Sequence, residues 1–309
     1  MSMANMSLQG TGYRCAAPAP EAGRSTRKLM KTIIALLIIL LLQLPGRAQS
    51  LLDLTTHLMR STFKLEGGGS VGTVFILLDP IPDATNSYRF LLVTAAHVLD
   101  NSQGDTALIH LRAKQNDEYS RFTHPVSIRN NGTNLWISHP DADVAVMYIA
   151  MPSTMDIGTI SSAGIFADDS FIEDNDIRPG DQLFALGYPL GAEANEFGFP
   201  ILRSGAIASY PLLPTRKVRT FLFDFKVYRG NSGGPVFIYT VNRLKGNPAN
   251  SVSFCRIMGL VSQEKIFTEQ VISMYRNQHE QHPLSVAVVV NASIIRETIE
   301  MLRNSTLGD

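Results

Sequence analysis

Three short stretches of the sequence carry side chains that together could perform nucleophilic chemistry. Ser232 lies in RGNSGGP, where three glycines and a proline predict a tight turn. A serine hydroxyl is a weak nucleophile at neutral pH, so it needs a base and a group that orients the base. His97 follows an apolar strand in LLVTAAHVL, and Asp143 directly precedes one in HPDADVAVMYI. An acid at the edge of an apolar strand can be desolvated and fixed, as a histidine-orienting carboxylate must be.

Short strands are the elements that must position these side chains. From Leu51 onward, segments rich in β-branched and aromatic residues are bounded by Gly, Pro, Asn or Asp, which is typical of strands. Two groups of about six such segments and a closing helix predict an all-β fold of two six-stranded antiparallel Greek-key barrels. The expected strands are 61–66, 72–77, 88–96, 107–113, 133–138 and 143–149, then 182–188, 201–209, 220–227, 235–240, 253–263 and 284–290, with the helix over 291–303.

The predicted domain plan has four parts. Residues 1–48 form a signal peptide with an N-terminal extension, 51–165 the first barrel, 166–181 a linker, and 182–309 the second barrel with the C-terminal helix. The linker holds five acids between residues 168 and 176, which could suggest calcium, but EF-hand-type spacing is absent, so a solvated linker is favoured. A further segment, 264–283, interrupts the last two strands and predicts a partly helical surface insertion.

The stretch from Met30 to Ser50, MKTIIALLIILLLQLPGRAQS, has the order of a secretory signal peptide. Its apolar core of about 12 residues is shorter than the roughly 20 that a bilayer span needs. We expect cleavage after Ala48 and a secreted or periplasmic protein. An uncleaved anchor, which would attach the protein to a membrane, and a buried helix are the alternatives. Met30 is a second possible start of the chain.

Charge and cysteine content narrow the partners and the chemistry. The chain has 27 basic and 27 acidic residues, but residues 1–48 hold six of the former and one of the latter, which leaves 21 against 26 and a net charge of −5. This acidic remainder without a basic run argues against nucleic acid. Cys15 precedes the apolar segment, so the body holds only Cys255 and no intrachain disulfide. A metal hydrolase is not supported, because the sequence has no HExxH motif and no close His/Asp cluster. We therefore expect neither a metal nor a cofactor.

The motifs TAAH, DADVAV and GNSGGP, in the order His, Asp, Ser, resemble the signature segments of chymotrypsin-fold (trypsin-like) serine proteases. The resemblance covers about residues 61–303 and implies two barrels with the active site between them. It implies that Ser232 attacks the scissile carbonyl, that His97 transfers the proton, and that Asp143 orients His97. The backbone N–H groups of Gly230 and Ser232 would form the oxyanion hole. The implied function is a secreted serine endopeptidase that forms an acyl-enzyme on protein or peptide substrates. The alternative is a weak or inactive relative that binds peptides.

The sequence departs from the digestive trypsins next to the nucleophile. Those enzymes have an aspartate there, which pairs with an amine that zymogen cleavage creates; this chain has Asn231, and a neutral amide cannot make that pair. The usual activation sequence is also absent, so we expect a site that folds competent without such cleavage. Asn231, the few cysteines, GYPLG (187–191) and RSGAIAS (203–209) are more similar to the bacterial HtrA/Do-type branch. The chain ends at Asp309, so the PDZ domains of that branch are not expected.

The resemblance also implies where the specificity pocket lies. Its walls would come from the residues before the nucleophile and from the strand that faces it, and the expected members are Asp224, Lys226, Tyr228, Ser262 and Glu264. Lys226 in the pocket would favour acidic substrate side chains, whereas Glu264 would favour basic ones. Either can instead face solvent. The sequence assigns neither a substrate nor an oligomeric state.

Overall fold

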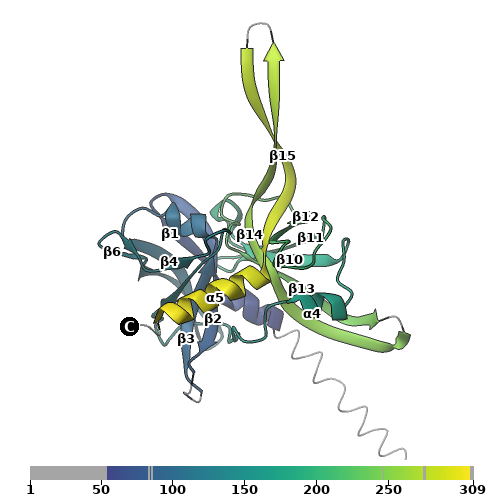
Figure 1. The fold of residues 1–309 in the computed structure, drawn as a ribbon. Helices are drawn as coiled ribbons and strands as arrows, with labels where there is room; N and C mark the ends of the chain where they lie inside the picture. Colours follow the sequence, from purple (N-terminus) through teal and green to yellow (C-terminus); the bar gives the residue numbers. More distant parts are fainter. Residues whose placement is uncertain (1–53, 83, 85, 246, 274–275, 307–309) are drawn as a thin grey trace, which may run out of the picture. The chain divides into compact units, whose positions relative to one another are not determined.

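The computed structural model describes residues 54–82, 84, 86–245, 247–273 and 276–306 of the 309-residue chain (Figure 1). All of them belong to one compact unit, Arg47–Asp309. The predicted signal segment lies outside the described residues. Among the residues that are described, no helix combines the length and the apolar character needed to cross a bilayer.

The first half of the chain forms an antiparallel sheet of seven strands, in the order β5-β4-β1-β2-β3-β9-β8, where six were predicted. The unpredicted strand, β5, is mostly exposed and lies at the sheet edge, so it lacks the buried apolar run that marks neighbours such as β2. The strands are β1 (Thr62–Gly67), β2 (Ser70–Pro80), β3 (Tyr88–Thr94), β4 (Thr106–Gln115), β5 (Glu118–Ser127), β8 (Ile137–Ser138) and β9 (Ala145–Ile149), with β6 (Arg129–Asn130) and β7 (Thr133–Asn134) as a separate pair.

The second half forms an antiparallel sheet of six strands, in the order β11-β10-β13-β14-β15-β12. A bridge between Ile207 and Phe223 brings the end of β11 beside β12, which curls the sheet toward closure. The strands are β10 (Gln182–Gly187), β11 (Ile201–Ala206), β12 (Thr220–Phe223), β13 (Pro235–Lys245), β14 (Asn247–Ser273) and β15 (Arg276–Asn291).

The segment 264–283 is not a partly helical insertion, and that prediction is wrong. It is the outer part of a long β14–β15 hairpin, paired from Glu264↔Ala287 to Ser273↔Arg276, which projects from the sheet (Figure 1). Residues 265–270 are exposed in succession, so neither face of this ribbon needs apolar side chains. The period-2 pattern that would have predicted strands is therefore missing.

Two further helices pack against the sheets. The predicted linker contains a short helix, α4 (Asp169–Asp174), and Asp168 caps it by accepting a hydrogen bond from the Phe171 N–H at 2.8 Å. The C-terminal helix α5 (Ala292–Thr306) follows directly from β15, yet it buries one apolar face in the core of the first sheet. That face consists of Ile294, Ile295, Ile299 and Leu302. The predicted all-β fold with antiparallel sheets and a C-terminal helix is confirmed.

Candidate active site

His97 lies on α3 (Ala96–Asp100), a single turn that begins two residues after β3 ends. Ala95 and Ala96 before it are buried, and such small side chains let the turn pack closely on the sheet. The His97 imidazole lies against Asp143, with 2.7 Å between Nδ1 and Oδ2. The His97 backbone N–H also donates to Oδ1 of Asp143, at 3.0 Å. Two contacts therefore fix the ring and its helix to one carboxylate.

Asp143 precedes β9 and accepts a further hydrogen bond, from the hydroxyl of Ser262 at 2.5 Å. Burial by itself raises the pKa of this carboxyl, but the hydrogen bonds from His97 and Ser262 outweigh burial and hold the pKa below its ordinary value of 3.8. The carboxylate is thus ionised at neutral pH and can only accept hydrogen bonds. His97 Nδ1 must then carry the proton of a neutral ring, which leaves the Nε2 lone pair available as a base.

Ser232 occupies the turn before β13, and its hydroxyl donates to the backbone carbonyl of Ser262 at 2.9 Å. Within the described residues the hydroxyl makes no hydrogen bond to His97. Transfer of its proton to the imidazole therefore requires the hydroxyl to leave the Ser262 carbonyl first. Catalytic hydrogen bonds of this kind often form only when substrate is bound.

The backbone of the serine turn has two features that suit anion binding. Gly230 has φ of +93°, and a Cβ there would lie 2.2 Å from the Tyr188 carbonyl oxygen, so only glycine fits. The N–H groups of Gly230 and Ser232 have no acceptor among the described residues. Two free N–H groups beside a nucleophile can stabilise the negative charge that develops on a carbonyl oxygen under attack.

Both sheets hold this turn. Thr73, on β2 of the first sheet, donates its backbone N–H to the Ser232 carbonyl at 2.9 Å and its hydroxyl to the Gly230 carbonyl at 2.6 Å. From the other side, the Gly233 N–H donates to the Val261 carbonyl of β14 at 2.7 Å. Thr73 was not predicted as a site residue, because threonine is common inside strands and carries no motif there.

A cavity of about 550 Å³ brings the three predicted residues together. Its lining consists of His97, Asp143 and Ser232 with Asn101, Val227, Tyr228, Arg229, Ser262, Gln263 and Glu264. Of the predicted specificity residues, Tyr228, Ser262 and Glu264 line this cavity, whereas Asp224 and Lys226 are exposed and are not part of its lining. The wall carries opposite charges at Arg229 and Glu264, and neither has an ion-pair partner within the described part of the chain.

Two acids of the predicted linker, Asp169 and Asp181, have polar partners within the protein. Asp169 accepts hydrogen bonds from the backbone and hydroxyl of Thr215, and Asp181 forms a two-pronged pair with Arg243 at 2.9 Å for each bond. Across the described residues, no group of three or more His, Cys, Asp or Glu side chains is placed to hold a metal ion. Cys255 is a buried free thiol.

Two antiparallel β-sheets that gather a histidine, an aspartate and a serine around one cavity define a trypsin-like fold. A model of the trypsin-like peptidase domain matches residues 82–246 of the 309, a range that includes His97, Asp143 and Ser232. The chain belongs to this family and is a trypsin-like peptidase.

Similar solved structures include two inactive forms of Rv3671c. A serine-to-alanine mutant of Rv3671c from M. tuberculosis H37Rv is 16% identical over 82% of this chain and 90% of that chain, with a TM-score of 0.42. The Rv3671c protease is 16% identical over 80% of this chain and 91% of that chain, with a TM-score of 0.41. No curated protein matches the chain.

Proposed function

We propose that the protein is a serine endopeptidase in which Ser232 is the nucleophile, His97 the general base and acid, and Asp143 the group that orients the imidazole. The observation that carries this proposal is the 2.7 Å contact between His97 Nδ1 and Asp143 Oδ2, at the wall of a cavity that also exposes the Ser232 hydroxyl. This contact selects the tautomer in which Nε2 can accept a proton.

In the proposed reaction, Ser232 Oγ attacks the carbonyl carbon of the scissile peptide bond while its proton passes to His97 Nε2. Asp143 stabilises the resulting imidazolium, and the N–H groups of Gly230 and Ser232 bind the oxyanion. Collapse of this intermediate breaks the C–N bond, and the leaving amine takes the proton from His97. Water then attacks the acyl-enzyme with His97 as its base, which releases the acid and restores Ser232.

A fluorophosphonate probe tests this proposal on the mature chain. We expect covalent labelling of Ser232 and hydrolysis of a peptide library, both lost in Ser232→Ala and both unchanged by a chelator. Absence of labelling in a correctly folded wild-type protein would favour the alternative, a relative that binds peptides without hydrolysis. A requirement for a further cut at residues 60–72 would contradict the expectation that the site folds competent.

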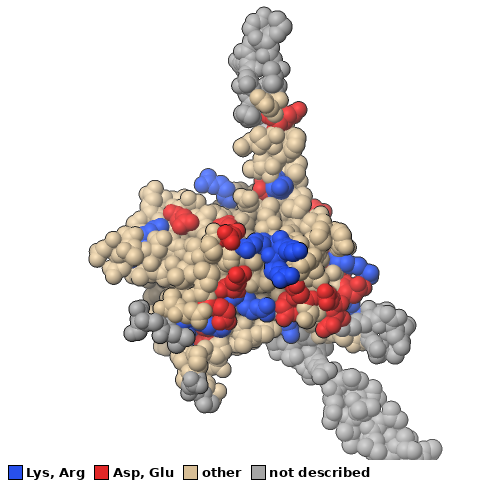
Figure 2. Space-filling model, in the orientation of Figure 1, with Lys and Arg blue, Asp and Glu red and all other residues tan. Residues whose placement is uncertain are grey.

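We further propose a secreted or periplasmic location, with protein or peptide substrates and neither nucleic acid nor a cofactor. Figure 2 shows basic and acidic side chains interspersed over the face that carries α5, where Arg296 pairs with Asp168 and Arg303 pairs with Glu300. Such a mixed surface suits a soluble peptidase better than a nucleic-acid-binding protein. N-terminal sequencing of the exported protein tests cleavage after Ala48; an intact N-terminus would instead support a membrane anchor.

A further inference from the structure

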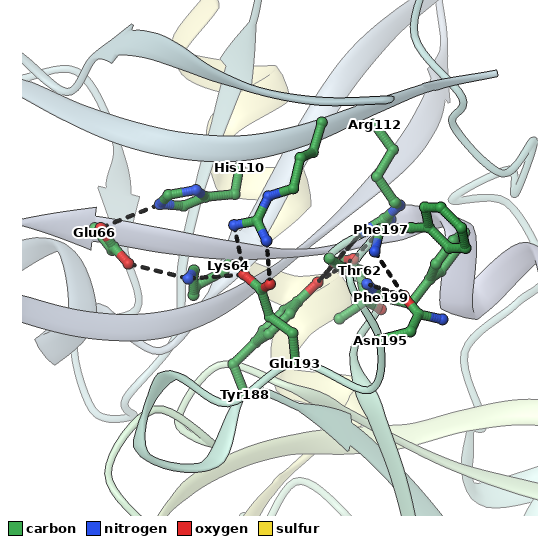
Figure 3. A network of polar contacts seen from close by, with 12 residues as sticks. Thr62, Lys64, Glu66, His110, Arg112, Tyr188, Glu193, Asn195, Phe197 and Phe199 are labelled. Atoms are coloured by element: carbon green, nitrogen blue, oxygen red, sulfur yellow. Dashed lines mark hydrogen bonds and ion pairs between the residues drawn. The ribbon is translucent and has the colours of Figure 1, made fainter. Parts of the chain in front are cut away.

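The loop between β10 and β11, residues 188–200, belongs to the second sheet in sequence but is fastened to the first sheet. Its Glu193 carboxylate pairs with Lys64 of β1 at 2.8 Å and with Arg121 of β5 through two hydrogen bonds of 2.6 and 3.1 Å. Figure 3 shows Glu193 at the end of a chain of contacts that runs from His110 through Glu66 and Lys64. We call the three residues Glu193, Lys64 and Arg121 the loop clamp.

The clamp carboxylate is well shielded, because the Glu193 side chain is only 13% exposed. Burial alone raises the pKa of Glu193, but Lys64 and Arg121 more than offset that effect and hold the pKa below its ordinary value of 4.5. The carboxylate is therefore charged at neutral pH. A carboxylate shielded from water depends on its ion pairs. Replacing Glu193 by a neutral side chain should therefore weaken the attachment of the loop to the first sheet.

Two further anchors, one at each end, fix the same loop. Arg112 of β4 is fully buried and donates to the Gly198 carbonyl at 2.8 Å, with its guanidinium stacked between Phe63 and Phe199 at 4.4 and 4.3 Å from the ring centres. At the start of the loop, Tyr188 is buried with its hydroxyl 3.1 Å from the Thr62 carbonyl. Glu193 lies between these two anchors in the sequence, so the clamp determines where the middle of the loop lies.

Among the described residues, one backbone hydrogen bond joins that loop to the serine turn. The Leu190 N–H donates to the Arg229 carbonyl at 2.6 Å. In a planar trans peptide the carbonyl and the following N–H point in opposite directions. The Leu190 contact fixes the Arg229 carbonyl toward the loop, so the Gly230 N–H of the same peptide group points away from the loop. Rotation of the Arg229–Gly230 peptide would break the hydrogen bond from Leu190. Leu190 itself has φ of +55°, an uncommon conformation for leucine that persists where the surroundings impose it.

We propose that the loop clamp positions the oxyanion hole. By pairing with Lys64 and Arg121, Glu193 holds the 188–200 loop so that Leu190 fixes the peptide between Arg229 and Gly230. The clamp thus orients the serine turn, which Asn231 cannot do through a charged pair because its side chain is neutral. These are positioning residues, since none of the three lines the cavity. The catalytic consequence rests on the proposed function, whereas the structural coupling does not.

The test replaces Glu193 by its neutral isostere. Glu193→Gln is compared with Asp181→Asn, which removes another two-pronged pair with arginine, Asp181–Arg243, whose members do not line the cavity. For Glu193→Gln we expect kcat to fall roughly tenfold to a hundredfold, up to the range seen when one oxyanion donor is removed, with KM changed less than about twofold. Fluorophosphonate labelling of Ser232 should slow in parallel, and Asp181→Asn should change neither rate.

Amide hydrogen exchange of residues 229–234 provides a readout that does not depend on catalysis. We expect faster exchange in Glu193→Gln but not in Asp181→Asn, because Asn231, Gly233 and Gly234 donate backbone hydrogen bonds within the turn and its contacts. If the wild type does not label, the proposed peptidase function fails. The exchange rates of Glu193→Gln and Asp181→Asn still test whether the loop clamp is coupled to the serine turn. Unchanged exchange and unchanged kcat in Glu193→Gln overturn the proposal. If that variant does not fold, Arg121→Gln, which leaves Lys64 in place, is judged by the same criteria.

Discussion

Replacing Ser262 with alanine removes one of the three hydrogen bonds that reach the Asp143 carboxylate. The Ser262 hydroxyl is 2.5 Å from Oδ2, the same oxygen that contacts His97 Nδ1, while the Ser262 backbone carbonyl that holds Ser232 is unaffected. The variant therefore weakens the support of the carboxylate without altering the acceptor of the Ser232 hydroxyl. We expect it to lower both activity and stability.

The size of the effect follows from the kind of bond and its exposure. A hydrogen bond to a charged group contributes about 1.5–3 kcal/mol. Because the Asp143 side chain is 26% exposed, water can replace part of this bond. We therefore expect the lost hydrogen bond to cost about 1–2 kcal/mol. If the whole cost falls on the transition state, kcat/KM decreases by roughly 5- to 30-fold.

The pH dependence of stability has a definite sign. The pKa of Asp143 is depressed in the folded protein, so this group favours folding above its ordinary pKa of 3.8 and loses that contribution as the pH falls through the folded-state pKa. Ser262→Ala raises that pKa toward its ordinary value. The stability difference between wild type and variant should therefore be largest at neutral pH and shrink below about pH 4.

A matched control separates the charge effect from the loss of any buried serine. Ser61 is fully buried and donates to the neutral carbonyl of Gly158 at 2.9 Å, and it does not line the cavity. Ser61→Ala should cost about 1 kcal/mol of unfolding free energy with no change in peptide hydrolysis. Denaturant unfolding and steady-state kinetics measure both variants. If Ser262→Ala lost no more activity than Ser61→Ala, the assigned role of the Ser262 hydroxyl would be refuted.

Two further substitutions probe the oxyanion turn and the C-terminal helix. Gly230→Ala places a Cβ 2.2 Å from the Tyr188 carbonyl at φ of +93°, so labelling of Ser232 should slow by about a hundredfold or more, as measured by probe kinetics. Asp79→Asn leaves Arg303 of α5 without its fully buried partner and should lower the unfolding free energy by about 3–5 kcal/mol in urea titrations at pH 7. Because the Asp79 pKa is depressed, this stability difference should diminish below about pH 3.8.

Local sequence patterns predicted the parts of the structure that depend on local chemistry. Strand segments such as 72–77 are apolar, β-branched runs that are buried throughout, and the motifs around His97 and Ser232 carry the candidate catalytic side chains within a few residues. The alternation of buried and exposed residues before the serine turn bears on the predicted pocket. In the segment 224–228 the apolar Phe225 and Val227 are buried, whereas Asp224 and Lys226, which alternate with them, are exposed. This alternation alone does not define the pocket, because Tyr228 is exposed as well and does line the cavity.

The parts that the sequence did not predict depend on pairs far apart in the chain or on strands without a buried face. The Ser262–Asp143 contact spans 119 residues and the Arg121–Glu193 pair spans 72, and neither leaves a local pattern. The mostly exposed strands, β5 and the outer parts of β14 and β15, are held by backbone pairing and by contacts with distant residues, such as that of Arg121 with Glu193. Their sequences are polar enough to suggest loops or helix.

The serine turn shows how a chymotrypsin-like site can be organised around a neutral residue. The five consecutive backbone carbonyls from Tyr228 to Ser232 all accept hydrogen bonds from the protein. In chain order, their donors are the N–H of Asn231, the N–H of Leu190, the hydroxyl of Thr73, the N–H of Gly234 and the N–H of Thr73. With these five carbonyls engaged, none is free to turn into the proposed oxyanion hole, whereas the N–H groups of Gly230 and Ser232 have no acceptor in the described residues. Asn231 can therefore remain neutral and buried, because the backbone, rather than a charged pair, orients the turn.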